Sequence, residues 1–434
     1  MRIRLKKYLI NNKNLAKITV LGFVVTFTRT IINLLISKIL AVGLGPAGIT
    51  LYGQLANYTA ILTTASTGAN TTGVVKLAAA NKGNNSYIEK LIATILLVNL
   101  GISTVFLLCS LFAPHYFSRL IFNTSEYATV LRVLGVSVFF GGLNTIYIGL
   151  LNGLGFYRLF LWYQMSINVL LLVLVASLVY LLKSVGALYA YLVVQIVAFV
   201  FMSGFLYKKK LLEKKFYVVK SFDFSILMSL GAYTIMSFSA VIFVNVSQIV
   251  LRSNIIALFN NEIAGIWDSM IKISMAYFAI ISSSLGVYFL PKLASRTSRQ
   301  AINNEVVNVI KLILPLVLLG FIVIYSLRVF LIRILLSDSF LVLADEFSVV
   351  LVGDVFKWLG WIFSYVLIAR GAVKYFLINE FLAFFSLIAL PIIGAKIFGF
   401  SGIFMGQTLG LFLYMCSSYM FYRLCLAYES KNEG

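Results

Sequence analysis

Apolar stretches of roughly twenty residues recur along this chain, from about residue 18 to about residue 424. Each stretch is long enough to cross a hydrocarbon core of about 30 Å as a single helix. Runs such as 167–182 are almost continuously apolar, whereas the strands of a membrane barrel alternate apolar and polar residues over about ten positions. The chain is therefore predicted to be an all-α polytopic membrane protein. We expect twelve spans, at about 18–40, 48–72, 88–112, 129–152, 160–182, 186–207, 224–251, 262–290, 306–328, 346–370, 374–396 and 401–424.

The composition excludes most other classes of protein. Hydrophobic residues make up 61% of the chain, charged residues only 11%, and the mean hydropathy is +0.99, so no separate soluble domain is expected. The three cysteines, Cys109, Cys416 and Cys425, have no paired spacing that would predict a metal site or a disulfide framework. No catalytic triad, metal-ligand pattern or phosphate loop is visible. We therefore expect a protein that is not an enzyme and carries no cofactor.

The 35 Lys and Arg residues greatly outnumber the 14 Asp and Glu residues. In a membrane protein this excess indicates topology, because basic residues near span ends are retained in the cytoplasm and meet anionic lipids there. With the N-terminus inside, 23 basic residues fall on the cytoplasmic side, eight on the opposite side and four within spans. We expect a multi-pass protein of the bacterial inner membrane with both termini cytoplasmic, in contact with membrane lipids and not with nucleic acid.

One long polar connection with the sequence KKKLLEKK divides the chain near its middle. Similar segments lie on either side of it: Gly48 precedes Lys76 by 28 positions, and Gly265 precedes Lys292 by 27. Because six spans separate the copies, they should share one orientation, related by a pseudo-twofold axis along the membrane normal. The predicted domains are an N-terminal six-helix bundle at 1–207, a cytoplasmic basic linker at 208–223 and a C-terminal six-helix bundle at 224–434.

Several charged residues fall inside predicted spans. An ionisable side chain there costs at least about 2.5–3.5 kcal/mol on insertion scales, so it normally faces a partner or a wet cavity. Asp268 and Lys272 lie at i and i+4 on one helical face and can pair, and Asp354 and Lys357 can pair at i and i+3. Each couple is either an ion pair that only permits insertion or part of a functional cavity. Glu380 lies about two turns from the inner end of its span.

Arg29 differs from these residues because it lies near the middle of the first span with no acid at i±3 or i±4. A cation at that depth favours a hydrated cavity that receives an anion, with snorkelling or pairing to the other half as alternatives. Lys38 and Arg252 lie near outer span ends, where they either snorkel or line the same cavity. A central cavity with a cationic excess suits a substrate that carries phosphate.

Three segments resemble a known family: SKILAVGLGPAGITLYGQ (Ser37–Gln54), AGIWDSMIKISMAYFAIISSSLGVYFLPKLA (Ala264–Ala294) and LVGDVFKWLGWIFSYVLIARGAVKYFLINE (Leu351–Glu380). They are similar to the corresponding stretches of Wzx-type flippases, particularly those for O-antigen and enterobacterial common antigen. The third segment is the most specific, since it places Asp354, Lys357 and Glu380 in a pattern that apolar drift does not easily generate. The resemblance implies the multidrug/oligosaccharidyl-lipid/polysaccharide exporter superfamily.

That resemblance implies two six-helix bundles that form a V around a central cavity and exchange access by rocking. It also implies a substrate: undecaprenyl diphosphate carrying one oligosaccharide repeat unit, moved from the cytoplasmic to the periplasmic leaflet. A polysaccharide polymerase and a chain-length regulator are the protein partners it suggests. The site residues would be Arg29, Lys38, Arg252, Asp268, Lys272, Asp354, Lys357 and Glu380.

Other functions stay open. A cation-coupled drug exporter of the same superfamily would share the fold but favour acidic cavity residues, and the first half of the chain has no deep acid. A lipid II flippase would usually carry spans beyond twelve. A polytopic polysaccharide polymerase or ligase would be an enzyme with a long periplasmic loop containing Arg and His, whereas the long basic loop here is expected in the cytoplasm and the chain has one histidine.

Overall fold

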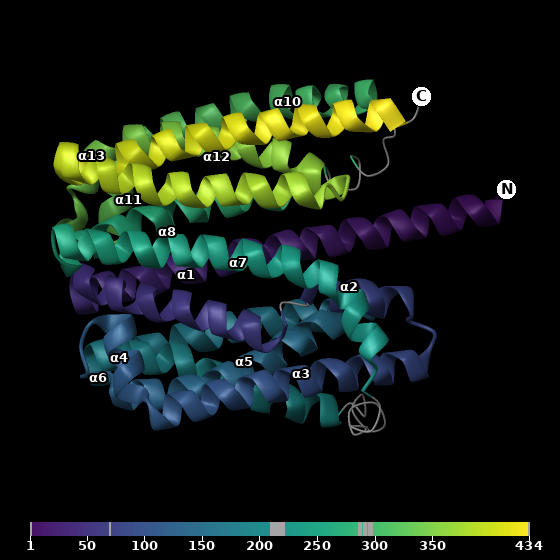
Figure 1. Cartoon of the computed structure of the whole chain (residues 1–434), viewed down its shortest axis with the longest axis horizontal. Coiled ribbons are helices and arrows are strands. Elements are labelled where there is room, and N and C mark those ends of the chain that lie inside the picture. Colours follow the sequence, from purple (N-terminus) through teal and green to yellow (C-terminus); the bar gives the residue numbers. More distant parts are fainter. Residues whose placement is uncertain are drawn as a thin grey trace. The chain divides into compact units, whose positions relative to one another are not determined.

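The computed structural model describes residues 2–68, 71–208, 222–284, 289, 293 and 298–432, and it is helical almost throughout that part of the chain (Figure 1). The helices are α1 (Arg2–Ser66), α2 (Thr71–Ala80), α3 (Asn85–Phe112), α4 (Pro114–Phe122), α5 (Ala128–Gly153), α6 (Tyr157–Lys208), α7 (Phe224–Leu258), α8 (Asn261–Ser284), α10 (Arg299–Ser326), α11 (Arg328–Leu335), α12 (Leu343–Ala369) and α13 (Val373–Asn432). A 3₁₀ turn, η2, covers Asp338–Phe340.

Three of these helices are each two helices joined at a kink. The joining residues have positive φ: Gly45 in α1, Lys183 in α6 and Gly399 in α13. In α6 and α13 the two arms of the hairpin approach each other closely. A Cβ atom added to Gly186 would lie 1.9 Å from the carbonyl oxygen of Leu178, and a Cβ atom added to Gly402 would lie 1.9 Å from the carbonyl oxygen of Gly394. Glycine at these points lets the two arms of each hairpin pack backbone to backbone.

The predicted count of twelve spans is confirmed. Within the described ranges, eight helices are long and apolar enough to cross a membrane. Three of them, α1, α6 and α13, contain stretches of 45, 49 and 55 residues, each about twice the length of one span. Since each of these three contains two spans, the eight helices supply eleven crossings. The twelfth is α8, whose 24 residues carry the charges described below. The all-α polytopic fold is therefore confirmed, while the V shape and the central cavity stay predictions.

The two halves of the chain repeat the same series of elements. A long helix, α3 or α10, is followed by a short one, α4 or α11, and then by another long helix and a kinked hairpin. The kinks at Lys183 and Gly399 stand 216 positions apart, the same offset that separates Lys76 from Lys292. This correspondence supports the repeat that the sequence predicted.

By packing, the chain divides into two compact units: unit 1 contains Met1–Ile36 and Leu51–Asn245, and unit 2 contains Ser37–Thr50 and Val246–Gly434. Two helices therefore contribute to both units, α1 through its kink and α7 through its second half. The predicted division at 1–207, 208–223 and 224–434 follows the sequence repeat and stays a prediction. Most of its linker, residues 209–221, lies outside the described part of the chain.

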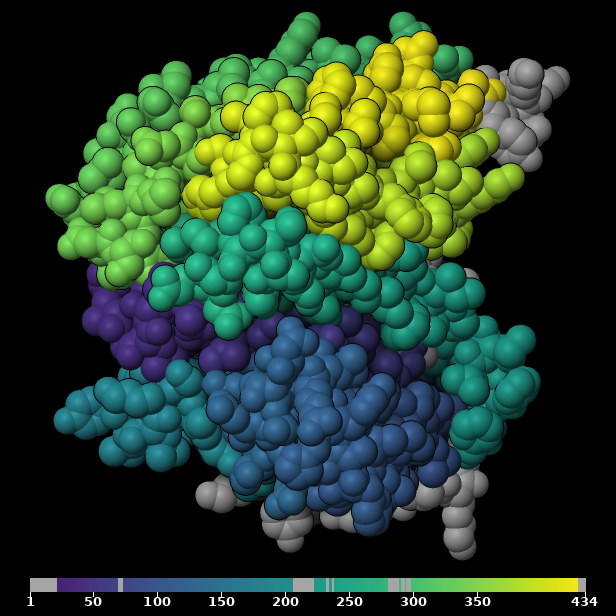
Figure 2. All heavy atoms as spheres, turned by 60° about the vertical axis from the view of Figure 1, so that its left-hand side comes forward, coloured from purple at the N-terminus to yellow at the C-terminus, as the bar shows by residue number. Residues whose placement is uncertain are grey.

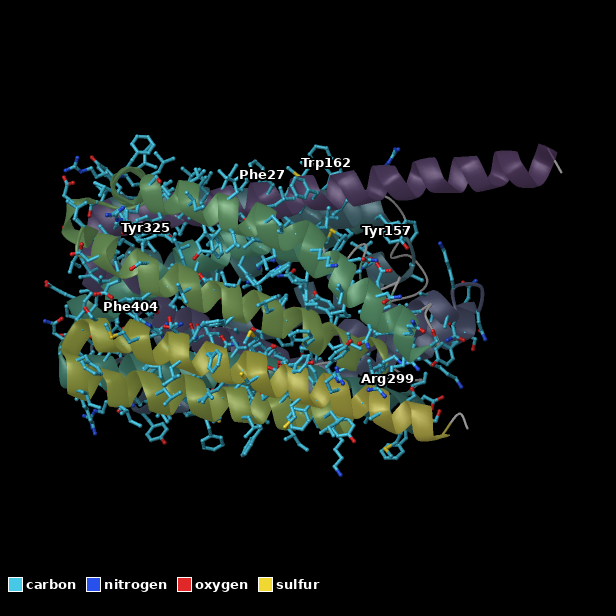
Figure 3. The ribbon with its side chains drawn as sticks, turned by 90° about the horizontal axis from the view of Figure 1, so that it is seen from above. Phe27, Tyr157, Trp162, Arg299, Tyr325 and Phe404 are labelled. Atoms are coloured by element: carbon cyan, nitrogen blue, oxygen red, sulfur yellow. The ribbon has the colours of Figure 1, made fainter. Side chains whose placement is uncertain are left out.

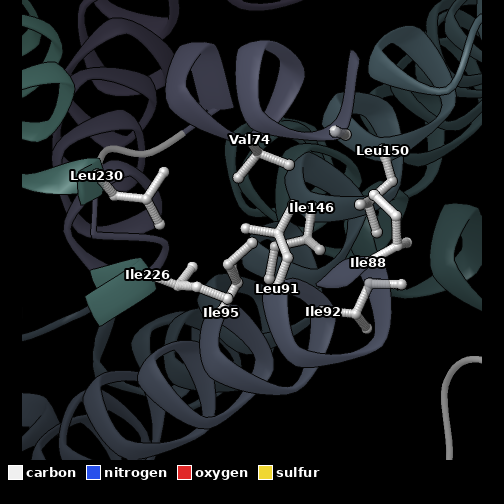
Figure 4. Close-up of a cluster of buried hydrophobic side chains, with 10 residues drawn as sticks. Val74, Ile88, Leu91, Ile92, Ile95, Ile146, Leu150, Ile226 and Leu230 are labelled. Carbon is white, nitrogen blue, oxygen red and sulfur yellow. The ribbon is translucent and has the colours of Figure 1, made fainter. Parts of the chain in front are cut away.

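Unit 1 has an apolar core in which the start of α7 packs against α2, α3 and α5 (Figure 4). Asp223 fixes that start: its main-chain N–H donates to Thr94 Oγ1 over 3.0 Å, and its carboxylate lies 3.6 Å from Lys90 Nζ. The Ser225 hydroxyl donates to the Asp223 carboxylate and lowers its pKa. The core residues are Val74, Ala78, Ile88, Leu91, Ile92, Ile95, Ile146, Leu150, Ile226 and Leu230.

The outer surfaces of both units carry large apolar side chains, as a bilayer requires. Phe27, Trp162 and Tyr325 are exposed to 45%, 68% and 41% (Figure 3). In Figure 2 the visible surface of unit 1 includes the segment around α3 in blue, and that of unit 2 includes α13 in yellow.

The kink at Lys183 leads to a stability prediction. Lys183 has φ 53° and ψ −131°, a backbone conformation that is unfavourable for every residue except glycine. Its counterpart in the second half of the chain is a glycine, Gly399, with φ 63° and ψ −140°. Lys183→Gly should raise the free energy of unfolding by about 1 kcal/mol, and Gly399→Ala should lower it by a similar amount. Thermal unfolding of the detergent-solubilised protein measures both. A lower melting temperature for Lys183→Gly at equal monodispersity would contradict the assignment of strain.

Candidate functional site

The best-defined charged contact inside the spans joins Arg252 of α7 to Asp268 of α8. Arg252 Nε donates to Asp268 Oδ2 and Nη2 donates to Oδ1, each over 2.8 Å, and the two side chains are only 2% and 5% exposed. The guanidinium carbon lies 5.9 Å from the ring centroid of Trp267. Such a bidentate pair combines two parallel charge-assisted hydrogen bonds. Arg252 Nη1 remains buried with no acceptor among the described residues.

This contact adds a partner that the spacing along one helix does not predict. Both oxygens of Asp268 accept from Arg252, while Lys272 interacts electrostatically with the same carboxylate, so the predicted pairing of Asp268 with Lys272 stays a prediction. A guanidinium matches the two carboxylate oxygens, which the single ammonium of a lysine does not. The burial of Arg252 excludes snorkelling, one of its two predicted roles. Lys272, one turn further along α8, lies within electrostatic reach of both Asp268 and Arg252, so two cations surround one carboxylate.

The predicted pair of Asp354 and Lys357 on α12 is present, with Lys357 Nζ 3.8 Å from Asp354 Oδ1. Asp354 is buried, and the Ser274 hydroxyl lies 2.8 Å from both of its oxygens, close enough to donate to either. Tyr277 OH also donates to Asp354. The two hydroxyls come from α8, so they connect this carboxylate to the neighbouring helix.

Lys357 itself is held only by weak contacts. Its ammonium nitrogen lies 4.5 Å from the ring centroid of Phe278 and 3.7 Å from the sulfur of Met275. At 3.8 Å the Asp354 oxygen is beyond ordinary hydrogen-bond distance. Within the described ranges, then, no oxygen accepts a hydrogen bond from Lys357. An ammonium in this condition retains most of its capacity to bind an anion.

These residues form one feature of unit 2, which we call the charged strip: Arg252, Asp268, Lys272, Asp354 and Lys357. Helix α8 carries it from Asp268 to Ser274, a rise of about 9 Å at 1.5 Å per residue. Three cations face two carboxylates, and both carboxylates already accept hydrogen bonds from protein groups. The strip therefore offers net positive charge within the spans.

Lys38 has a different environment in unit 2. Its ammonium donates to the main-chain oxygen of Arg333 over 2.8 Å and also to that of Leu336, at the end of α11. The last carbonyls of a helix lack partners within the helix and carry the negative end of its dipole. These two hydrogen bonds satisfy the Lys38 ammonium without a substrate, so the predicted role of Lys38 in lining a cavity stays a prediction.

Arg29 lies on α1 in unit 1, where its side chain is exposed and no carboxylate pairs with it among the described residues. Its charge reaches Tyr191 of α6. Glu380 lies on α13 in unit 2, half-buried, within electrostatic reach of Tyr414 and without a paired cation in the described part of the chain. Neither residue contacts the charged strip through any described hydrogen bond or ion pair, and for both a role in binding stays a prediction.

A close approach between the α1 kink and α8 was not predictable from the sequence. A Cβ on Gly265 would lie 1.8 Å from the main-chain oxygen of Pro46, and Thr50 Oγ1 donates to the main-chain oxygen of Asn261 over 2.7 Å. We call this contact the Pro46–Gly265 crossing. The two glycine-containing segments are similar in sequence, but this similarity does not indicate that they contact each other.

Ser274 and Tyr277 were also not predictable as site residues, because hydroxyl residues are common in membrane helices and carry no distinctive pattern. No three His, Cys, Asp or Glu side chains converge as a metal site within the part of the chain that was searched.

Comparisons with known proteins supply independent information. No protein-family model matches the chain. The chain is 27% identical over 379 residues to the Lipid III flippase of Escherichia coli K12, covering 85% of this chain and 88% of that protein, and it matches the Lipid III flippase of Shigella flexneri equally.

The fold is similar to solved transporters. An inward-facing MATE family transporter of the MOP superfamily has a TM-score of 0.79 at 16% identity, covering 96% of this chain and all of that chain. The outward-facing form gives 0.72 at 17% identity, covering 96% of each chain. A MOP superfamily transporter from Pyrococcus furiosus, described as having a binding pocket of reversed polarity, gives 0.69 at 17%, with the same coverage.

These comparisons confirm the predicted fold, which the chain shares with solved transporters of the MOP superfamily, and its similarity to flippases, but not the Wzx subtype. The similar proteins are transporters and flippases, which agrees with the expectation that the chain is not an enzyme. The chain is an integral membrane protein with the architecture of a transporter.

Proposed function

We propose that this chain, which has the MOP superfamily fold, is a flippase for undecaprenyl diphosphate carrying an oligosaccharide repeat unit of the O-antigen type. It moves the headgroup from the cytoplasmic to the periplasmic leaflet by alternating access. The observation that carries the proposal is the charged strip, whose three cations exceed its carboxylates inside the spans of unit 2.

The chemistry of the headgroup explains the need for such a strip. Sugars and a diphosphate cannot enter hydrocarbon unaided, because each polar group would lose its hydrogen bonds with water. Lys357 has only weak protein contacts, and Arg252 Nη1 has no protein acceptor among the described residues. Both offer donors to phosphate oxygens, which form strong charge-assisted hydrogen bonds. The polyprenyl tail can stay in lipid while the headgroup crosses.

The curated relatives support the same class of cargo, since their name describes the flipping of a lipid. The repeat unit delivered to the periplasmic leaflet would be taken up there by a polysaccharide polymerase under a chain-length regulator. Membrane lipids surround the exposed apolar surfaces of both units.

One observation favours a second function, a cation-coupled exporter of drugs or other small molecules. Glu380 is a half-buried carboxylate with no paired cation among the described residues, and MATE family multidrug transporters share the fold. The excess of cations in the charged strip argues against it, because like charge repels the cationic substrates that such an exporter would bind.

We propose that the protein lies in the bacterial inner membrane with both termini cytoplasmic. An impermeant thiol reagent should then label Ser125→Cys and Asp338→Cys from outside intact cells, but not Ser86→Cys, in a version without the native cysteines. All three positions are exposed, whereas Ser118 in the same outer region is buried and unsuitable. Strong external labelling of Ser86→Cys with no labelling of Asp338→Cys would reverse the orientation.

Arg29 provides the cellular test of the proposed function. In a host without its own copy of the protein, Arg29→Ala should lower surface polysaccharide at least about tenfold, the loss expected when about 1.4 kcal/mol of interaction with phosphate is removed. Arg29→Lys should keep part of the activity, because the charge remains while the planar fork is lost. The lipid-linked repeat unit should accumulate on the cytoplasmic face. Normal polysaccharide from Arg29→Ala at equal protein level would remove Arg29 from the site.

A further inference from the structure

We propose that Trp361 and Tyr365 of α12 form a sugar-binding surface beside Lys357, so that sugar rings stack on the aromatic side chains while Lys357 binds the diphosphate. This inference rests on the proposed function and specifies how the headgroup is recognised. We call the three residues the α12 ladder.

The geometry of the ladder is regular. Lys357, Trp361 and Tyr365 follow one another at intervals of four, which places them on one face of α12 over a rise of about 12 Å. The rings of Trp361 and Tyr365 lie 5.7 Å apart at 72°. Phe278 of α8 lies 4.8 Å from Trp361 at 81° and also lies under the Lys357 ammonium. The buried Phe278 thus fixes the positions of both the cation and the indole.

The ladder is partly open, unlike the neighbouring tryptophan of the same helix. Lys357, Trp361 and Tyr365 are all of intermediate exposure, whereas the neighbouring Trp358 is only 1% exposed. A fully buried tryptophan contributes packing to the core, and a partly open one keeps a ring face available for a ligand. Trp358 therefore contributes to the core, while Trp361 keeps a ring face available for a ligand.

The chemistry selects one occupant for this surface. A sugar ring presents C–H groups that pack on an aromatic face and hydroxyls that bond to a tyrosine hydroxyl, and such mixed apolar and polar linings are typical of ligand sites. Lys357 adds the charge for a phosphate and lacks an oxygen acceptor in the described part of the chain. A lipid tail needs no ammonium, and a cationic drug would be repelled by it. A saccharide joined to a diphosphate uses both features.

The test measures binding to the purified full-length protein in nanodiscs by native mass spectrometry with two probes. One probe is undecaprenyl diphosphate, and the other is undecaprenyl diphosphate bearing one N-acetylglucosamine. The wild type should bind the sugar-bearing probe at least about fivefold more tightly than the bare one. Trp361→Ala should abolish this preference and leave the affinity for the bare probe unchanged, while Trp361→Tyr should keep part of the preference. Lys357→Met should weaken the binding of both probes.

Trp162→Ala provides the control, since that tryptophan is 68% exposed on unit 1 and should change neither affinity. If wild type binds both probes but Trp361→Ala and Trp361→Tyr keep the full preference for sugar, the ladder is wrong while the proposed function stands. If the wild type binds neither probe, the proposed function is contradicted, and the proposed sugar-binding role of the ladder is contradicted with it.

Discussion

Replacing Asp268 by alanine is expected to lower the free energy of unfolding by about 3–5 kcal/mol, because it leaves the Arg252 guanidinium buried without its carboxylate. For a unit of this size the melting temperature should fall by on the order of 10 °C. Arg252 and Asp268 make two 2.8 Å hydrogen bonds and are almost fully buried, so neither can turn to solvent for a replacement partner. The measurement is thermal unfolding of the purified protein in detergent.

The exposed pair of Arg333 and Asp338 offers a matched control. Its atoms approach to 3.1 Å, but the side chains are 63% and 79% exposed, so Asp338→Asn should change stability by less than about 0.5 kcal/mol. The double variant Arg252→Met with Asp268→Leu should recover most of the loss, since it removes both buried charges at once. Equal effects of Asp268→Ala and Asp338→Asn would show that the buried pair does not stabilise the fold.

The second large effect is expected at the Pro46–Gly265 crossing. Gly265→Ala places a methyl group where the main-chain oxygen of Pro46 lies only 1.8 Å away, and neither backbone can yield without moving its helix. We expect a loss of at least about 3 kcal/mol of stability or a failure to accumulate in the membrane. The measurement is the melting temperature together with the membrane level by immunoblot.

Gly320→Ala is the control for this change, because it lies in α10 with nothing within 4 Å of the added Cβ. Alanine is the better helix former by about 1 kcal/mol, so this variant should be neutral or slightly more stable. Wild-type stability and level for Gly265→Ala would contradict the close approach of α1 and α8.

The extent to which sequence predicted structure depends on how local each feature is. The spans followed from hydropathy, which is a property of consecutive residues, and the kink at Gly45 lies in the segment between the first two predicted spans. The pair of Asp354 and Lys357 was predictable because both residues lie on one helix. Arg252 and Asp268 lie on different helices, and the packing that joins them cannot be read from spacing along either one.

Lys38 shows a different limit of sequence reasoning. Its partners are main-chain oxygens at the end of α11, and every residue has such an oxygen, so no side-chain pattern could indicate them. The shared membership of α1 and α7 in both units was equally hidden, because it depends on contacts between segments far apart in the chain. Charge inside a span predicted the pair of Asp354 and Lys357 on one helix but not the pair of Arg252 and Asp268 on two.

The most direct test of the central claim is transport by the purified protein in liposomes. A probe of undecaprenyl diphosphate bearing a fluorescent sugar starts in both leaflets, and an impermeant reductant destroys the fluorescence of accessible molecules only. With this protein, nearly all of the fluorescence should be lost, and Lys357→Met with Trp361→Ala should slow the loss of the inner-leaflet share. The proposed function would be contradicted if the liposomes with protein retained as much fluorescence as protein-free liposomes while the same folded protein transported a cationic dye. That result would favour a drug exporter.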